Sequence, residues 1–201
     1  MLDAAVFLNA FTALFVIIDP IGAALIFHSL NPAHEFKYRI IVALKVFCFS
    51  LLLLIGFGVY GKELLAQLGI SIAALRIAGG ILLFYTAFHM ITRELRFDLD
   101  SGRGDISVFP MSIPLVAGPG SLTVCILLFS SSSPANTQIS VALAVIAVCA
   151  LCFVLMLASP LVKRLVGRSG DEILRRFLGV LLAALAIQFI MDGVSGFGLQ
   201  G

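Results

Sequence analysis

Long apolar runs separated by short polar segments dominate the chain. Six stretches are almost free of charge and lie at about 5–29, 40–60, 70–91, 108–130, 139–161 and 173–193. A helix needs about 20 predominantly apolar residues to cross the hydrocarbon core of a bilayer. Polar and apolar residues do not alternate within the runs, as they would in the strands of a membrane barrel. The pattern predicts an all-α, polytopic membrane protein with six transmembrane helices.

Composition supports the same class. Of 201 residues, 61% are hydrophobic and 12% are charged, whereas an average soluble domain has about 25% charged residues. A soluble globule of this length cannot bury so much apolar surface. The net charge of +2 is too small to attract nucleic acid, and all four cysteines lie inside apolar runs, which argues against redox or zinc chemistry. We expect the lipid bilayer, and no nucleic acid, as a partner.

Lysine and arginine are concentrated in alternate connections between the apolar runs. The connections after the first, third and fifth runs hold most of them: Lys37, Arg39, Arg93, Arg96, Arg103, Lys163, Arg164, Arg168, Arg175 and Arg176. On the other side, Lys62 is the one basic residue in a connection. Cytoplasmic loops of membrane proteins carry the excess of Lys and Arg. We therefore expect these three connections in the cytoplasm and both termini on the opposite side.

The two halves of the chain share landmarks in the same order. Asp19–Gly22 (D-P-I-G) corresponds to Gly118–Ser121 (G-P-G-S), and Arg76–Leu82 corresponds to Arg176–Leu182, since both read R-x-x-G-x-x-L. Three spans in each half would place the second half upside down in the membrane. The expected organisation is two inverted three-helix repeats, with helices 1 and 4 broken: the repeats occupy 1–97 and 108–201, joined by a cytoplasmic linker at 98–107.

The Pro/Gly breaks are the most informative feature, because each falls near the middle of its run. Irregular backbone at membrane depth persists only where it is buried in protein or lines a wet cavity. Paired interruptions in corresponding halves are typical of the midplane binding sites of secondary transporters. Half-helices starting after Gly22 and Gly120 would direct free N–H groups at a carboxylate. The alternative is two proline kinks used for packing. The candidate substrate-binding residues are Asp19, Pro20, Gly22, Gly118, Pro119, Gly120, Ser121 and Thr123.

Asp19 is a carboxylate at mid-depth, where a charge is costly and should face the protein interior. It would hold a proton, a sodium ion or a substrate ammonium, or it would cap local backbone N–H groups. Ser121 and Thr123 follow the second break and are either ligand hydroxyls or helix caps. Coupling to H⁺ or Na⁺ stays open, and no other cofactor is expected.

Three polar residues near the outer ends of two runs are candidates for coupling or gating. Gln188 and Asp192 are four residues apart and share one helix face. Arg76 either extends its charged end to the membrane interface or pairs with Asp192. The histidines lack H-x-x-x-H spacing, so no metal site is expected.

Four segments resemble the MarC family, also called UPF0056 or the neutral amino acid transporter family. They are Ile18–Gly22 (I-D-P-I-G), Leu75–Phe84 (L-R-I-A-G-G-I-L-L-F), Ile113–Thr123 (I-P-L-V-A-G-P-G-S-L-T) and Gln188–Gly193 (Q-F-I-M-D-G). The resemblance covers almost the whole chain. It implies a six-span protein of the bacterial inner (plasma) membrane with both termini on the periplasmic side. Many relatives carry Asn at the position of Asp19.

The resemblance implies secondary transport of small neutral amino acids such as alanine or glycine, or of similar small solutes, and no enzymatic activity. The alternatives are a LysE-like exporter of another small metabolite, or a channel. An intramembrane hydrolase built on Ser121 would need a histidine on a facing helix, and the last three runs contain none. Self-association into a homo-oligomer stays open.

The expected topology can be tested by cysteine labelling in intact cells, after the four native cysteines are replaced. A cysteine at position 134 should react with an impermeant reagent, and a cysteine at position 101 should be protected, because the basic connections face the cytoplasm. Labelling at position 101 but not at 134 would reverse the orientation.

Overall fold

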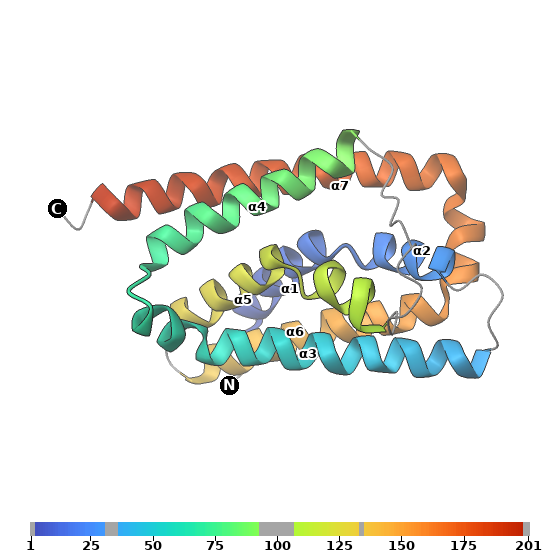
Figure 1. Ribbon diagram of the computed structural model, residues 1–201, viewed down its shortest axis with the longest axis horizontal. Coiled ribbons are helices and arrows are strands. Elements are labelled where there is room, and N and C mark those ends of the chain that lie inside the picture. The colour runs from blue at the N-terminus through green and yellow to red at the C-terminus, as the bar shows by residue number, and fades with distance from the viewer. Residues whose placement is uncertain (1–2, 31–35, 93–106, 133–134, 199–201) are drawn as a thin grey trace.

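The computed structural model describes residues 3–30, 36–92, 107–132 and 135–198, and they are almost entirely helical. The helices are α1 (Ala4–Ile18), α2 (Pro20–Leu30), α3 (Phe36–Gln67), α4 (Ile72–Thr92), the π-helix η1 (Ser107–Val116), α5 (Pro119–Ser131), α6 (Ala135–Leu157) and α7 (Ser159–Gly198). No strand occurs in these residues. The expected all-α fold is confirmed (Figure 1).

Within the described residues, five helical segments are long and apolar enough to cross a membrane, and they start at Ala4, Phe36, Ile72, Thr137 and Glu172. The remaining apolar run, expected as one broken helix, is divided into η1 and α5, of 10 and 13 residues. Neither reaches the about 20 residues that a crossing helix needs. The polytopic membrane class is therefore confirmed, whereas the count of six crossings and the inverted repeat stay predictions.

The broken segments run in opposite directions through the centre of the bundle. In Figure 1, α1 and α2 lead from one end of the molecule to the other, and η1 and α5 lead back. α1 begins and α7 ends at the same end of the bundle (Figure 1). The proposed linker lies, except for Ser107, outside the described residues, as do Arg93, Arg96 and Arg103.

The end of the bundle where α2 and α6 finish carries basic residues. Arg39, near the start of α3, donates from Nη2 to the carbonyls of Met156 and Leu157, both at 3.3 Å, and to Ser159 Oγ at 2.7 Å. A cation is well placed there, because the last carbonyls of a helix are unpaired and carry partial negative charge. Arg39 thus fixes α3 to the corner between α6 and α7.

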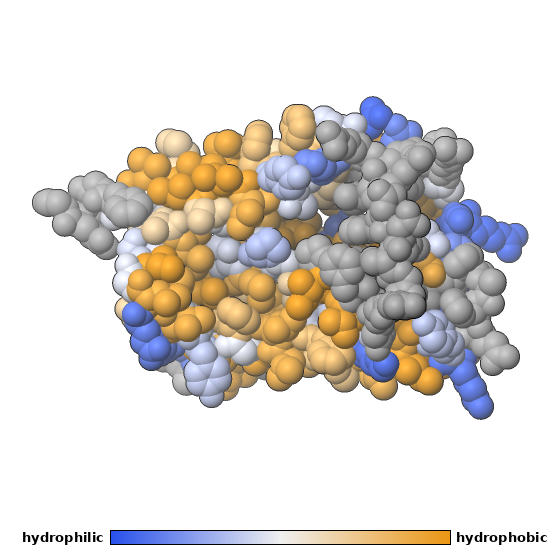
Figure 2. Space-filling model, in the orientation of Figure 1, coloured by the Kyte–Doolittle hydropathy of each residue, from blue (hydrophilic) through white to orange (hydrophobic). Residues whose placement is uncertain are grey.

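Apolar side chains cover much of the outer surface as well as the interior. Figure 2 shows them over most of the visible face, with hydrophilic residues gathered mainly toward the ends. Exposed examples are Leu52, Tyr60 and Phe88, whereas Leu14, Phe27 and Met156 are fully buried. This distribution suits lipid contact, since lipid tails are as apolar as a protein core.

α4 and α7 pack antiparallel through small residues spaced seven apart. Three glycines each lie against the backbone carbonyl of an alanine on the facing helix: Gly80 against Ala186, Gly179 against Ala87, and Gly193 against Ala73. A Cβ added to these glycines would lie 2.7, 3.3 and 2.8 Å from the respective carbonyl oxygens. Helices approach this closely only where side chains are absent, which is how membrane helices associate.

The glycine contacts between α4 and α7 predict a position-specific effect on stability. Gly80→Ala should lower the free energy of unfolding by about 1–3 kcal/mol, the usual cost of overpacking, because its Cβ would be 2.6 Å from Ile190 Cγ1. Gly56→Ala on α3 is the matched control, since nothing lies within 4 Å of its Cβ position. Thermal unfolding in detergent should show a loss for the first variant alone, and equal Tm values would contradict the close packing.

Candidate functional site

The first break is a single residue, Asp19, which ends α1 and begins α2. Its φ of 48° and ψ of 71° place it in the left-handed region, which Asp tolerates better than most residues. Its N–H donates to Phe15 O at 3.1 Å, and its Oδ1 accepts from the N–H of Gly22 at 2.9 Å. Asp19 therefore caps both helices. Whether it also holds a proton, a sodium ion or a substrate ammonium stays a prediction.

Gly22 is required by the position of the Asp19 carboxylate. A Cβ at Gly22 would lie 2.1 Å from Asp19 Oδ2 and 2.8 Å from Cγ. Only a residue without a side chain lets the carboxylate fold back over the first turn of α2. The half-helices begin at Pro20 and Pro119, not after the glycines as expected. Proline suits the first helical position, because its missing N–H would have no partner there.

The second break lies between η1 and α5, at Ala117 and Gly118. The N–H of Ala117 donates to Ser112 O at 2.8 Å, which continues the wide turn of the π-helix. Gly118 is extended, with φ −79° and ψ 170°, and offers no side chain to cap α5. The Ser121 hydroxyl donates to Val116 O at 2.8 Å and is 3.0 Å from Gly118 O. Gly118 O also accepts from the N–H of Leu122 at 2.9 Å, so the main contribution of Ser121 at the break is its bond to Val116 O.

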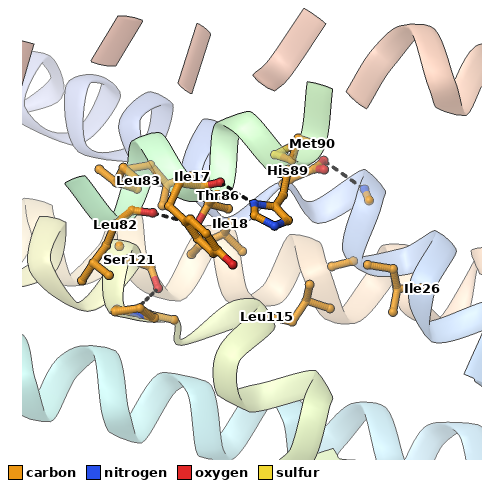
Figure 3. A pocket seen from close by; sticks show the side chains of 17 residues that line it. Ile17, Ile18, Ile26, Leu82, Leu83, Thr86, His89, Met90, Leu115 and Ser121 are labelled. Carbon is orange, nitrogen blue, oxygen red and sulfur yellow. Dashed lines mark hydrogen bonds between the residues drawn. The ribbon is translucent and has the colours of Figure 1, made fainter. Parts of the chain in front are cut away.

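Both breaks meet at one cavity of about 380 Å³. Figure 3 shows its walls, where side chains from the first break, from η1 and α5, and from α4 point toward one another. The breaks are close together, because a Cβ at Gly120 would lie 2.4 Å from Leu83 Cδ2 and 3.8 Å from Ile17 Cγ2. The structure thus brings together segments that are far apart in the sequence.

Six of the eight candidate binding residues line this cavity: Asp19, Gly22, Gly118, Pro119, Gly120 and Ser121. Pro20 and Thr123 are buried but do not line it. Thr123 Oγ1 donates to Pro119 O at 2.8 Å, and its methyl group packs against Gly79. Thr123 therefore acts as a helix-packing residue between α5 and α4. A binding role for all eight residues stays a prediction.

The candidate coupling residues lie away from the cavity. Gln188 Nε2 donates to Asp192 Oδ1 at 2.7 Å, so these two do share a helix face. Within the described ranges, no ion pair joins Arg76 to Asp192. None of the three lines the cavity.

The α4 wall of the cavity escaped the sequence analysis. Tyr85, Thr86 and His89 line it, one or two helical turns from Leu82 on the same face. The sequence does contain a sign of this wall, because polar side chains that are three and four residues apart on an apolar helix lie on the same side. The signal was missed because these residues also resemble side chains that reach toward the membrane interface.

His89 and Ser121 line the same cavity but are not hydrogen-bonded to each other. The Ser121 hydroxyl donates to backbone carbonyls, and His89 Nδ1 lies 2.9 Å from Tyr85 O. Nucleophilic catalysis requires a hydrogen bond between the hydroxyl and the base, and none links these two side chains. Within the described residues no group of three His, Cys, Asp or Glu side chains could hold a metal ion.

A second cavity, of about 220 Å³, lies at the end of the bundle where α1 begins. Its polar lining comes from Asn9 of α1, Ser131 and Ser132 at the end of α5, and Thr137 of α6. Between the two cavities, α1 and α5 contribute Leu14 and Cys125, which are both fully buried. Buried side chains therefore separate the parts of α1 and α5 that line the two cavities.

These features define a polytopic, all-α membrane protein with two interrupted helical segments around an internal cavity. The family model described as "MarC family integral membrane protein" matches residues 4–197, and the chain belongs to this family.

Several similar proteins have names that describe them as membrane proteins. The chain is 32% identical over 206 residues to a UPF0056 membrane protein of Methanocaldococcus jannaschii, which covers 97% of this chain and 98% of the relative. It is 34% identical to one of Archaeoglobus fulgidus (94% and 92%) and 31% identical to YvbG of Bacillus subtilis (96% and 93%). No solved structure matches the chain.

The bonds at the second break predict a specific sensitivity to Ser121→Ala. Losing the donor to buried carbonyls should cost about 1–3 kcal/mol of unfolding free energy and increase hydrogen exchange near the break. Ser130→Ala is the control, because Ser130 Oγ bonds to Leu127 O within a regular part of the same helix, at 3.0 Å. Equal losses for the two variants would show that Ser121 has no special role at the break.

Proposed function

We propose that the protein is a secondary transporter of small neutral amino acids, such as alanine or glycine, or of similar small solutes. The observation that carries this proposal is the convergence of two helix breaks on one cavity. Secondary transporters place their substrate sites at interrupted helices, where free backbone groups bind polar parts of the substrate. Membership of an integral membrane family supports the same class.

The two breaks differ in the charge that they offer a zwitterion. α5 begins at Pro119, and the residue before it, Gly118, provides no side-chain cap. Its first turn therefore has N–H groups and a positive dipole end for a carboxylate. The start of α2 is different from the sequence-based expectation, because Asp19 already caps it. The Asp19 carboxylate provides negative charge for the ammonium group.

The two cavities fit alternating access. The larger cavity extends from the breaks toward the ends of α2 and α4, where Ile26 and Met90 line it. The smaller lies at the opposite end. If the basic end faces the cytoplasm, as the distribution of Lys and Arg predicts, the larger cavity belongs to an inward-facing state. Movement of α1 against α5 around Leu14 and Cys125 would then connect the site to the outside.

A carrier is favoured over a channel by the buried side chains between the two cavities. Leu14 and Cys125 have no exposed surface, and an open pore would need a continuous wet path. Counterflow separates the two classes, because only a carrier shows saturable exchange of labelled for unlabelled alanine. The direction of net transport in cells and the coupling ion are outcomes of the same assay in imposed H⁺ or Na⁺ gradients.

The role of Asp19 gives the sharpest test in proteoliposomes. Asp19→Ala should abolish alanine or glycine counterflow, because losing a buried charge partner costs about 2–5 kcal/mol, roughly 30- to several-thousand-fold in affinity. Asp19→Asn keeps an oxygen for the Gly22 N–H, so it should retain binding with an altered pH or sodium dependence.

Asp3→Asn is the matched control for these variants. Asp3 also caps a helix, accepting from Ala5 N and Val6 N at 3.0 and 3.2 Å, but it lies outside the cavity. It should transport like the parent protein. Parent-like transport by Asp19→Ala at every pH would make the carboxylate structural, and a parent protein that moves no amino acid would overturn the proposed function.

A further inference from the structure

The imidazole of His89 is held in a fixed orientation at the wall of the larger cavity. Its Nδ1 lies 2.9 Å from the carbonyl oxygen of Tyr85, one turn earlier in α4. Its ring lies 4.1 Å from the Tyr85 ring, centroid to centroid, and meets the Phe88 ring edge-on at 6.2 Å. Figure 3 shows the ring extending from α4 into the space between Thr86 and Leu115. The side chain is half-buried.

The bond to Tyr85 determines what the other ring nitrogen can do. A carbonyl oxygen only accepts hydrogen bonds, so the hydrogen of this bond belongs to Nδ1 of His89. In the neutral imidazole the second nitrogen, Nε2, then carries a lone pair and no hydrogen. His89 therefore offers the cavity a hydrogen-bond acceptor. This is an uncommon group in a wall that is otherwise built largely from Ile, Leu and Met side chains.

An amino acid's ammonium group needs several acceptors, because it has three N–H donors. Among the described residues of this wall, Asp19 is the other acidic or basic side chain, apart from the phenol of Tyr85. Its Oδ1 already accepts from the Gly22 N–H, at 2.9 Å. The Ser121 hydroxyl hydrogen is directed at backbone carbonyls of the second break. A further acceptor from a different helix would complete the coordination of the ammonium group.

We propose that His89 is a substrate-binding residue that accepts a hydrogen bond from the substrate ammonium through Nε2. This inference rests on the proposed function, because it assigns a residue of α4 to the same amino acid site. It also gives α4 a role in the site: the breaks of α1–α2 and η1–α5 bind one side of the substrate, and α4 binds it from across the cavity.

The first experiment measures alanine binding and counterflow by purified variants. His89→Leu should weaken alanine binding roughly 10- to 150-fold, as expected for losing a hydrogen bond to a charged group. His89→Gln should recover part of this loss, because its amide oxygen is also an acceptor. His28→Leu is the control, since His28 lies on α2 but does not line the cavity, and it should bind alanine like the parent.

The second measurement reports on the imidazole itself. In protein labelled with ¹⁵N-histidine, the signal that disappears in His89→Gln should show a protonated Nδ1 and an unprotonated Nε2. Saturating alanine should shift the Nε2 signal while Nε2 stays unprotonated, as an acceptor does.

The outcomes separate the two proposals. Unchanged alanine affinity in His89→Leu, or an Nε2 signal that alanine leaves unmoved, overturns the role of His89 while the transporter stands. An Nε2 that becomes protonated when alanine binds also overturns it, since the ring would then donate to the carboxylate. A parent protein that neither binds nor exchanges alanine overturns the proposed function and this inference together.

Discussion

Every backbone polar group inside a membrane must find a partner in the protein, and this constraint shapes the centre of the molecule. Each break frees N–H and C=O groups, and an unpaired group in hydrocarbon costs several kcal/mol. One short polar side chain at each break meets part of this need: Asp19 pairs with the Gly22 N–H, and Ser121 pairs with Val116 O. These two side chains pair part of the backbone that the breaks leave open, while the start of α5 has no side-chain cap.

Close contacts at glycines fix the position of α4 relative to α5 and α7. Glycine contacts hold α4 to its neighbours on two sides, with Gly80 against Ala186 of α7 and Gly79 against Thr123 of α5. Gly120 in turn admits Leu83 of α4 next to the second break. Because side chains are absent at these contacts, the backbones approach closely and the helices are fixed laterally. The cavity wall formed by α4 therefore keeps a defined distance from both breaks.

The helix breaks could be predicted from the sequence, whereas the packing and pairing of individual side chains could not. The Asp19–Gly22 and Gly118–Ser121 motifs revealed the breaks, because Pro and Gly act on the backbone directly. Whether Thr123 faces the cavity or α4 depends on the packing of α5, which no local pattern specifies. Likewise, no local pattern specifies that Asp192 pairs with Gln188 instead of Arg76. The π-helical turn of η1 left no recognisable signal in a run of apolar residues.

If Asp19 binds a substrate ammonium as proposed, its observed use as a helix cap has a consequence for substrate exchange. A carboxylate in a membrane interior usually depends on a bound cation, but here the Gly22 N–H and the positive end of the α2 dipole stabilise its negative charge. The site can therefore lose its substrate without leaving the carboxylate wholly uncompensated. The substrate ammonium would then bind to a carboxylate that the Gly22 N–H and the α2 dipole already stabilise. Weak, reversible binding of this kind is what a carrier needs, because a substrate held too tightly could not be released on the other side of the membrane.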